Sequence, residues 1–600
     1  MCGLAGVFVY RTGARPVNEG ELLRMREAMV TRGPDGAGLW ISKDRQVGLA
    51  HRRLAIIDTT AAGAQPMSTS DGALCIVYNG EIYNYRKLRK ELQAKGYRFA
   101  TQSDTEVLLH LYREYGHGMV HHLRGMYAFA LWDAGKRGLF IARDPFGIKP
   151  LYYSNNGATV RVASQVKALL ASGAVDTSPE PAGHVGFYLW GYVPDPYTLY
   201  KGIRALPAGT TLWVDAGGQD VPRPFFNIRE SLILAEERAR AVTASDMRDQ
   251  LREALLDTVQ HHLIADVPVG LFLSSGIDST TLAALARESG AEGLQTVTLA
   301  FDEYRDKAED EAPLAELVAA QLGARHVTRR VSRNEFESES ARFLSVMDQP
   351  SIDGLNTYFA SKAAADTGLK VAISGLGGDE LFGGYPSFKE IPGTVRCLKP
   401  FTFVPGLGRG FRFVSSPVLK QHTSPKYAGV LEYGGTYGGA YLLRRGLYMP
   451  WELPGFLDGE FVRKGWEELG TLARLEETTT GISSGHLKIV ALEMAWYMRN
   501  QILRDSDWAS MAHGLEVRVP FVDICLFERL TAHLALPSPP TKRDLSTVPM
   551  DKLPPNVVAR GKTGFGTPIQ GWMRDRISAS GERGYRPWAR HVYEHYKLAS

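Results

Sequence analysis

The sequence predicts a two-domain protein of the α/β and α+β classes, with paired β-sheets and helices in its first part and a parallel sheet in its second. A chain of 600 residues is too long for one hydrophobic core. Residues 1–165 consist of short apolar runs broken by Gly, Asn and Asp, which is typical of strands joined by tight turns. Beyond residue 244, continuous apolar runs alternate with helical periodicity, which favours a parallel sheet.

In the first part we expect strands in runs such as GLAGVFVY, VGLAHRRLAIID and ALCIVYNGEIYN. Helices are predicted around 17–31 and 104–116, the second with Asp104 as its cap and with an apolar stripe. Residues 192–210 are dense in Pro and Gly and predict a connector, and a polar stretch at 215–224 ends this part. We therefore place the first domain at residues 1–210.

The second part begins with a predicted helix at 244–264, in which Met247, Leu251, Leu255, Val259 and Leu263 recur every four residues and mark one buried face. Buried strands are predicted at 267–273, 294–301 and 369–375, with a helix after the first of them. Residues 385–455 are rich in Gly, Pro and aromatic residues with a basic bias, and the pattern of 385–490 predicts no role. The second domain is placed at 235–600.

Composition excludes several classes of protein. The net charge is +4, from 69 basic and 65 acidic residues, which gives no reason to expect nucleic acid as a partner. Four distant cysteines without a CxxC pair argue against a zinc ribbon or a disulfide framework and fit a reducing compartment. No run approaches the ~18 apolar residues of a membrane span, and the N-terminal residues, without a basic segment or a long apolar run, predict no secretory signal. We expect a cytoplasmic protein without a membrane partner.

Cys2 follows the initiator methionine directly. If Met1 is removed, one residue carries both a thiol and an α-amine that titrates at about 7.7–8.0, so that the amine could activate the thiol as a nucleophile. The simpler interpretation is that Cys2 merely starts a buried strand. Taken alone, residues 1–8 favour that simpler interpretation.

The segment LFLSSGIDSTTLAAL predicts a strand, a short loop and a helix N-terminus. Ser274, Ser275, Gly276 and Ser279 supply small donor-rich groups there, which is the local geometry of a phosphate site. The ending of a Walker loop is absent, and Asp278 is best explained as a Mg²⁺ ligand. The alternative is an ordinary tight turn between strand and helix.

A second loop of this kind lies in AISGLGGDELFGGY, where Asp379 and Glu380 follow a predicted strand. In an open parallel sheet two such loops face one crevice, so that Asp278 and Asp379 could share a metal. A third segment, VVARGKTGFGTPIQGW, places Arg560 and Lys562 in a loop. Lys562 is functional only if it reaches that crevice, where it could offset charge as a phosphoryl-linked bond breaks.

The motifs of the second part match those of a known enzyme family. The second part resembles the ATP-pyrophosphatase domain of glutamine-dependent asparagine synthetases, whose Ser-Gly-Gly-x-Asp-Ser loop is matched at 274–279 and whose Ser-Gly-x-Gly-x-Asp-Glu loop is matched at 374–380. SMAHGLEVRVPFVD and the Lys-x-Gly-Phe segment at Lys562 also match. The resemblance implies that ATP contacts a set of residues on these loops and the next strand: Leu273, Ser274, Ser275, Gly276, Asp278, Ser279, Leu299, Ser374, Gly375 and Glu380.

The first part resembles the class II glutamine amidotransferases, which implies an Ntn-type αββα sandwich and a catalytic N-terminal cysteine. The matching segments are MCG, RGPD, HRRL, YNGE and SDTE. In this resemblance Cys2 attacks the glutamine side chain, and Asn79 with the Gly80 N–H holds the oxyanion. Arg53 suits the glutamine α-carboxylate, while Glu81 and Asp104 suit its α-ammonium group.

The implied reaction has two parts. One site hydrolyses glutamine to ammonia, and the other uses Mg-ATP to adenylate a carboxylate, which ammonia converts to an amide. A passage that excludes solvent is expected between the sites, and the resemblance also suggests a homodimer. Aspartate is the leading acceptor. Leu376 stands where asparagine synthetases often carry an acidic residue, and Gln349 stands where Glu is usual, both at positions expected to read the acceptor.

Alternatives therefore stay open. The same mechanism could amidate another carboxylate, such as a sugar uronic acid or a secondary-metabolite acid. A binding or regulatory protein that kept the fold is a third hypothesis, against which the near-complete set of catalytic residues speaks. β-Lactam synthesis is disfavoured because that branch usually lacks the N-terminal cysteine. A phosphoribosyl-type amidotransferase is excluded by the adenylating loop.

Overall fold

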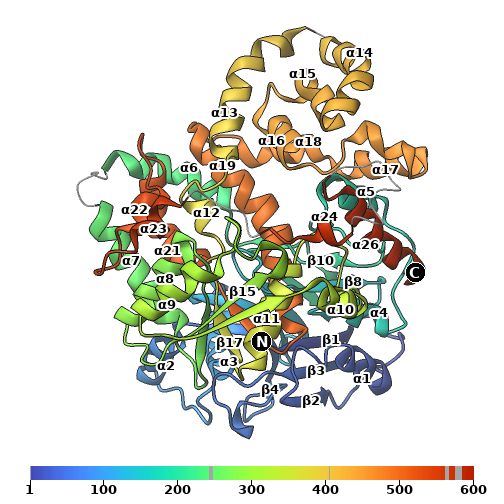
Figure 1. The fold of residues 1–600 in the computed structure, drawn as a ribbon. Coiled ribbons are helices and arrows are strands. Elements are labelled where there is room, and N and C mark those ends of the chain that lie inside the picture. Colours follow the sequence, from blue (N-terminus) through green and yellow to red (C-terminus); the bar gives the residue numbers. More distant parts are fainter. Residues whose placement is uncertain (1, 242–246, 405, 561–565, 574–583, 600) are drawn as a thin grey trace.

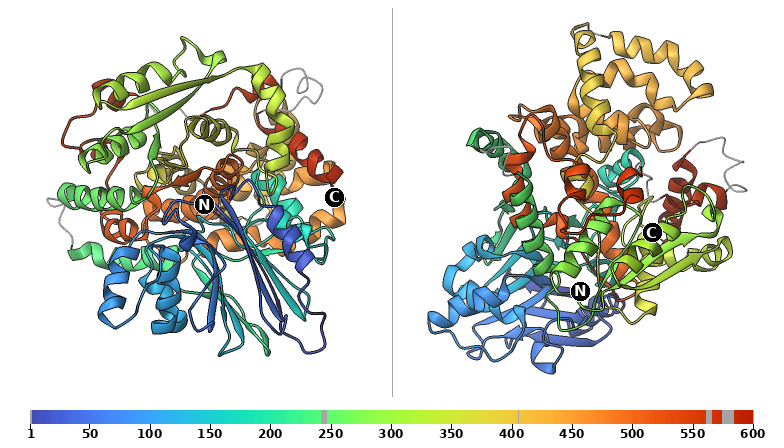
Figure 2. Two further views of the ribbon diagram at one scale, coloured as in Figure 1. Left: turned by 90° about the horizontal axis from the view of Figure 1, so that it is seen from below. Right: turned by 60° about the vertical axis from the view of Figure 1, so that its left-hand side comes forward.

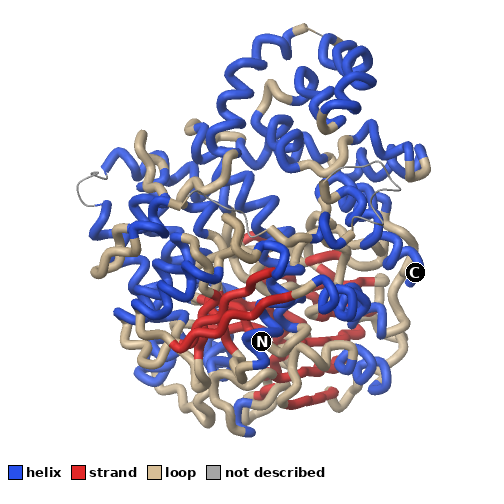
Figure 3. The backbone as a smooth tube through the Cα atoms, viewed as in Figure 1, coloured by secondary structure: helices blue, strands red, loops and turns tan. Residues whose placement is uncertain are grey.

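The computed structural model describes residues 2–241, 247–404, 406–560, 566–573 and 584–599 (Figure 1). Strands gather in one half of the molecule and a mostly helical part projects from the other (Figure 3). Three sheets form the framework: two antiparallel sheets from the first part of the chain and one parallel sheet from the second. The expected two-domain α/β and α+β class is confirmed.

The two antiparallel sheets pack face to face. The first has the order β10-β8-β9-β1-β3-β2, and the second the order β12-β11-β7-β6-β5-β4 with β13 beside β11. The first comprises β1 (Gly3–Val9), β2 (Gly36–Ile41), β3 (Val47–Arg53), β8 (Tyr152–Asn155), β9 (Thr159–Ala163) and β10 (Arg204–Ala205). The second comprises β4 (Met67–Ser68), β5 (Leu74–Ile82), β6 (Gly125–Asp133), β7 (Gly138–Arg143), β11 (Thr210–Asp215), β12 (Gly218–Gln219) and β13 (Arg223–Pro224).

Helices cover both outer faces and complete the αββα sandwich. On β1, Leu4 and Phe8 point into the core between the sheets, whereas Ala5, Val7 and Val9 point outward into a second core, which explains why this strand is apolar throughout. That second core contains α1 (Glu19–Glu27) and α4 (Val166–Ala171), and the outer face of the second sheet packs on α2 (Tyr85–Ala94) and α3 (Asp104–Tyr115).

Two details differ from the predicted elements. Ser103, not Asp104, caps α3, because its side chain accepts from the Thr105 N–H at 3.1 Å while Asp104 starts the helix and is buried. The stretch 192–210 is not only a connector, since it contains β10, and β11 begins at Thr210. β11 pairs with β7, so the second sheet continues through β13.

The parallel sheet has the order β16-β15-β14-β17-β18, so the strand order reverses between β14 and β17. Its strands are β14 (Val269–Phe272), β15 (Gln295–Phe301), β16 (Arg325–Val331), β17 (Val371–Ile373) and β18 (Glu516–Arg518). The loops that follow β14 and β17 diverge at this reversal and leave a crevice at the carboxyl ends of the strands. Both phosphate-type loops predicted above lie there.

Helices surround this sheet. Those associated with it are α6 (Ile228–Arg238), α7 (Met247–His262), α8 (Ile277–Glu288), α9 (Ala312–Gln321), α10 (Arg333–Val346), α11 (Leu355–Asp366), α12 (Gly378–Leu381), α20 (Arg504–Met511), α21 (Ile524–Leu534), α22 (Lys542–Ser546) and α23 (Pro555–Ala559). Outside this set and the projecting part described below lie α5 (Pro181–Trp190), α24 (Ile569–Trp572) and α26 (Arg586–Ala599). No helix among the described residues is long and apolar enough to cross a membrane.

The segment without a sequence assignment folds into the projecting helical part (Figures 1 and 2). It contains α13 (Ser387–Leu398), α14 (Leu407–His422), α15 (Val430–Tyr433), α16 (Tyr437–Arg445), α17 (Gly459–Leu469), α18 (Thr471–Thr479) and α19 (Gly485–Leu492), which runs into a π-helical segment (Glu493–Leu503) and α20. Aromatic and Leu residues of this part share a core with α5, α10 and α11.

Buried charges join the two domains. Arg124, which precedes β6, donates to Asp523 at 2.9 Å, to Asp257 at 2.8 Å and to the Thr258 hydroxyl at 3.0 Å. Arg124 and Asp523 are both buried. A buried carboxylate is stable only while its partner is present, so this contact ties the two domains together.

We expect Arg124→Ala to lower the free energy of unfolding by about 3–5 kcal/mol, because Asp523 would stay buried without its cation. Denaturant titration followed by fluorescence measures the loss. The control is Arg223→Ala, which removes an exposed ion pair with Asp220 and should cost about 1 kcal/mol or less. Equal effects of the two variants would contradict a stabilising role of the buried contact.

Candidate active sites

The first site surrounds Cys2, which directly precedes β1 and is buried. Its neighbours come from β3, β5 and the start of α3: Arg53, Leu54, Tyr78, Gly80, Glu81 and Asp104 line one small cavity with it. The strand interpretation and the nucleophile interpretation are thus compatible, since Cys2 stands at the tip of a buried strand. Burial raises the pKa of the thiol, so a nearby base is needed to form the thiolate.

Asn79 holds the main chain of Cys2. The Cys2 nitrogen donates to Asn79 Oδ1 at 2.9 Å, whereas Asn79 Nδ2 is buried and has no hydrogen-bond partner among the described residues. A buried donor without a partner is costly, which indicates that it faces a ligand oxygen. At Gly80 an added Cβ would lie 2.1 Å from the Met126 carbonyl oxygen, so only glycine allows β5 to pass here.

The predicted glutamine-binding side chains lie around the same cavity. The Arg53 guanidinium donates to the Thr60 carbonyl at 2.7 Å and also to the Asp58 carbonyl, which fixes it at the rim. Asp104 accepts from the Tyr78 hydroxyl at 2.9 Å and from the Ile82 N–H at 3.1 Å. Burial nevertheless raises the pKa of Asp104 to about 6.

Glu81 belongs to both the first site and the domain interface. Its carboxylate lies 3.3 Å from Arg518 Nη2 of β18, and burial and the nearby Glu516 raise its pKa. Arg518 also donates to Glu516 at 2.7 Å. Arg518 opposes this rise, so residues of the second domain act on the protonation of Glu81 in both directions.

His51 belongs to β3 and does not line the cavity of the first site. Burial lowers the pKa of His51 to about 3, so the ring is neutral at physiological pH. Its Nε2 lies 3.0 Å from the Tyr78 carbonyl oxygen and must donate to it. Nε2 is thus committed to the main chain of β5, whereas the buried Nδ1 has no hydrogen-bond partner among the described residues.

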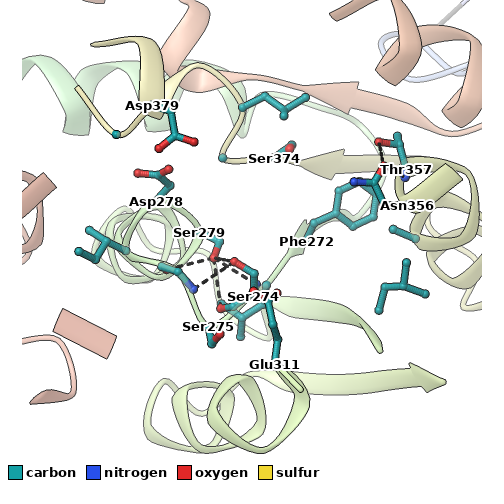
Figure 4. A pocket seen from close by; sticks show the side chains of 18 of the residues that line it. Phe272, Ser274, Ser275, Asp278, Ser279, Glu311, Asn356, Thr357, Ser374 and Asp379 are labelled. Carbon is teal, nitrogen blue, oxygen red and sulfur yellow. Dashed lines mark hydrogen bonds between the residues drawn. The ribbon is translucent and has the colours of Figure 1, made fainter. Parts of the chain in front are cut away.

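The second site is a cavity of about 390 Å³ at the reversal point of the parallel sheet (Figure 4). Nearly all the residues predicted to bind ATP line it: Leu273, Ser274, Ser275, Gly276, Asp278, Ser279, Leu299, Ser374 and Gly375. Glu380 does not, since its buried carboxyl accepts from the Tyr385 hydroxyl at 2.9 Å and burial raises its pKa to about 7. Lys562 lies outside the described residues.

The loop between β14 and α8 is built to receive an anion. Ser274 Oγ lies 2.8 Å from Ser279 Oγ and accepts from the Gly276 N–H at 3.1 Å, which fixes the loop. Gly276 caps α8 without a side-chain hydrogen bond, and the buried Ser275 hydroxyl has no partner among the described residues. Uncapped N–H groups and a spare hydroxyl at a helix N-terminus suit a phosphate.

The two predicted metal ligands point toward each other at one side of the cavity (Figure 4). Both contact Lys542 Nζ, which is 3.0 Å from Asp379 Oδ1 and also binds Asp278. Burial opposes the charge on Lys542, but the two carboxylates outweigh it and raise its pKa. Gly378 makes this approach possible, since an added Cβ would lie 2.8 Å from the Asp278 carboxylate.

The residues present fit a Mg²⁺ ion bound together with nucleotide phosphates. No group of three or more metal-binding side chains occurs among the described residues. Mg²⁺ commonly takes only one or two protein carboxylates and completes its shell with phosphate oxygens and water. Asp278 and Asp379 supply that number, on loops whose free donors suit a phosphate.

The two residues expected to recognise the acceptor lie in different parts of the structure. Leu376 lines the cavity, as do Asn356, Thr357 and Ser506. The expectation for Gln349 was wrong: it is buried at the domain interface, where its Nε2 donates to the Tyr152 hydroxyl at 3.2 Å. The preceding Asp348 accepts from the N–H groups of Val166 and Lys167 at the start of α4, so this segment docks the domains.

A short chain of contacts links the sites. Arg32 Nε donates to the Cys2 carbonyl at 3.0 Å, and the two Nη atoms of Arg32 donate to the Asp507 carboxylate at 2.6 and 3.1 Å. Asp507 follows Ser506, which lines the second cavity. The main chain at the thiol is thus held by the helix that borders the other site.

Comparison with known proteins agrees with this geometry. A glutamine amidotransferase domain model matches residues 1–226, and an asparagine synthase model matches residues 250–587, more than half of the chain. This chain belongs to the asparagine synthase family. Its two matched domains make it an enzyme of glutamine-dependent amide synthesis, an ATP-dependent C–N ligase.

Family relatives span nearly the whole chain. Glutamine-hydrolysing asparagine synthetase 1 of Bacillus subtilis is 33% identical over 587 residues, 96% of this chain and 89% of the relative. Asparagine synthetase 3 of the same organism is 30% identical over 88% of this chain and 80% of its own length. A relative with another name, amidase chry2 of Gibberella zeae, is 31% identical over 65% of this chain and 60% of its own.

The raised pKa of Asp104 predicts the acid limb of glutamine hydrolysis. Below about pH 6 its carboxylate gains a proton and loses attraction for an ammonium group, so kcat/KM for glutamine should fall by about a further tenfold per pH unit there, beyond the fall that protonation of the Cys2 α-amine causes. Steady-state kinetics across this range measure both ionisations. Asp104→Asn should remove the ionisation near pH 6 and leave that of the amine, and Asp71→Asn, at an exposed carboxylate, should leave both unchanged. An ionisation near pH 6 that survives in Asp104→Asn would contradict the assignment.

Proposed function

We propose that Cys2 hydrolyses glutamine and that the cavity between β14 and β17 adenylates a carboxylate, most simply that of aspartate, which the released ammonia then converts to an amide. The observation that carries this proposal is the shared interface: Arg32 holds the Cys2 carbonyl and, through Asp507, the border of the second cavity. Ammonia made at one site would cross this interface to reach the other.

At the first site the proposed chemistry needs Met1 to be removed, so that Cys2 carries a free α-amine. The amine takes the thiol proton, and Sγ attacks the side-chain amide carbon of glutamine. Asn79 Nδ2 and the Gly80 N–H stabilise the oxyanion. The C–N bond breaks as the proton passes to the leaving ammonia, and water then hydrolyses the thioester to glutamate. His51 is a weak alternative base, because burial lowers its pKa to about 3 and it does not line the cavity, which supports the amine as the base.

At the second site the acceptor carboxylate attacks the α-phosphorus of ATP and pyrophosphate leaves. Ammonia then attacks the acyl carbon, and AMP leaves with the bonding electron pair. Asp278 and Asp379 would hold Mg²⁺, which supplies charge neutralisation at the phosphates. The Ser274 to Ser279 loop would bind phosphate oxygens, and Lys542, already between the two carboxylates, would balance charge beside them. Lys562 stays a prediction for this role.

Leu376 favours a second class of carboxylic acid as a candidate acceptor. This side chain borders the cavity and can neither donate a hydrogen bond nor titrate, although aspartate brings an ammonium group and a second carboxylate that need polar partners. A carboxylic acid with fewer additional charged groups, such as a uronic acid, would need fewer polar partners on this side of the cavity.

The experiment that decides the acceptor is pyrophosphate release from the purified protein with Mg-ATP and glutamine, with and without aspartate, and with mass identification of the product. Aspartate-dependent release with formation of asparagine supports the main proposal. Glutamine hydrolysis without aspartate-dependent release rejects aspartate, and a panel of other acids should then include the true acceptor.

Cys2→Ala should reduce glutamine-dependent amide synthesis at least about 1,000-fold, because the nucleophile is lost. Synthesis from added ammonium salt should continue at a similar rate, since the second site is unaltered. Cys397→Ala, at an exposed thiol, is the matched control and should behave as the parent protein. Loss of both activities in Cys2→Ala would contradict a purely catalytic role of the thiol.

Asp278→Asn should lower pyrophosphate release at least about 100-fold with either nitrogen source, because one metal-binding carboxylate is removed. Glutamine hydrolysis should remain, which shows that the variant is folded. The matched control is Asp551→Asn at an exposed position in the same domain. Undiminished pyrophosphate release by Asp278→Asn would remove the metal assignment.

A further inference from the structure

Helix α14 carries an apolar stripe that faces solvent. Leu407, Phe411, Val414 and Val418 follow one another at spacings of four, three and four residues, which places them on one face of the helix, and all four are exposed. The other face packs on α15: an added Cβ at Gly408 would lie 2.5 Å from Glu432 Cα, and Arg412 donates to Glu432 at 2.7 Å. Surface helices normally turn such a stripe inward.

Two further exposed apolar side chains adjoin this stripe: Phe403 precedes the helix, and Phe413, next to Val414 in sequence, lies about 100° further round it. We name the whole set the apolar ridge, defined as Phe403, Leu407, Phe411, Phe413, Val414 and Val418. Phe413 is 86% exposed, Phe403 78% and Val414 76%. Rings this exposed stand out from the surface and do not line a groove. Contiguous exposed apolar residues on a folded protein mark a surface that contacts something else.

The surroundings of the apolar ridge are basic. Residues 391–431 contain six Lys and Arg residues and no Asp or Glu. Arg409 is largely exposed, and Glu432 beside it already pairs with Arg412. The ridge is therefore complementary to a surface that is apolar inside and negatively charged at its boundary.

The position of the ridge suits a broad, flat partner. α14 lies at the outer end of the projecting helical part, far from the three sheets, in both views that show it in profile (Figures 1 and 2). A flat surface can meet this end without first meeting the body of the protein.

We propose that the apolar ridge binds the surface of an anionic lipid bilayer, with its Phe and Val side chains in the headgroup boundary and the neighbouring Lys and Arg residues on the lipid phosphates. Helices that lie on membranes combine such an apolar face with basic flanks. A second copy of this chain fits less well, because two ridges would bring two basic, acid-free segments together. An acidic protein partner would need a pocket for each protruding ring.

This proposal does not depend on the proposed function, and it concerns binding at a membrane surface. The expectation of no membrane partner rested on the absence of an apolar run long enough to span a bilayer. Interfacial binding needs only a short amphipathic helix with suitable flanks.

Vesicle flotation tests the proposal with the full-length protein. We expect it to float with vesicles of phosphatidylcholine and phosphatidylglycerol, not with phosphatidylcholine alone, and to dissociate as salt is raised, since exposed charge pairs are screened. The triple variant Phe403→Ser, Phe413→Ser, Val414→Ser should bind at least about tenfold more weakly. The control Val221→Ser, Met550→Ser changes two equally exposed apolar residues elsewhere and should bind as the parent does.

Glutamine hydrolysis by each variant verifies that it is folded, because none of these residues belongs to either active site. Absence of flotation with anionic vesicles, or equal flotation of the triple variant, overturns the proposal. Analytical ultracentrifugation of the same proteins identifies the alternative. A concentration-dependent dimer that the triple variant loses, without vesicle binding, would assign the ridge to a second copy of the chain.

Discussion

The buried ion pair between Arg32 and Asp507 is the contact on which the relation of the two sites depends. Both side chains are almost wholly removed from water, and the guanidinium binds the carboxylate through two hydrogen bonds. Removing such charges from water is costly unless each finds its partner, so the pair is stable only when the domains dock in this register. Because Arg32 Nε also binds the Cys2 carbonyl, docking and the position of the nucleophile are set together.

The rest of the interface follows the same principle. Arg518 binds Glu516 and lies beside Glu81 from the first domain, and Arg124 reaches across to Asp523. An apolar interface tolerates small shifts, whereas a set of buried charges does not, because each shift leaves a charge unpaired. We infer that the two domains are held in one fixed arrangement, which a transfer of ammonia between their sites would require.

Sequence patterns predicted the parts of the sites that are local. The phosphate-type loop at Ser274 can be identified from its short motif, a strand followed by Ser and Gly residues. The role of Cys2 can be predicted once the other motifs of the first part are considered. Lys542 escaped prediction because it is distant in sequence from Asp278 and Asp379, and nothing in its surroundings, PPTKRDL, indicates that the fold brings them together. Gln349 was misplaced for a related reason: its motif was identified, but the contact with Tyr152 is tertiary. Helix α14 gave no prediction because Gly408, Gly410 and Pro417 interrupt its pattern.

The contacts of Lys542 bear on how the second site can work. Asp278 and Asp379 approach each other from loops on neighbouring strands, where their like charges repel, and the ammonium group between them offsets that repulsion. Mg²⁺ bound by these carboxylates would compete with Lys542 for them. Nucleotide phosphates would bring further negative charge into the cavity that Lys542 lines. A lysine at this position would therefore offset the charge of the carboxylates and, with ATP bound, that of the phosphates, which would keep the repulsion between the two loops low.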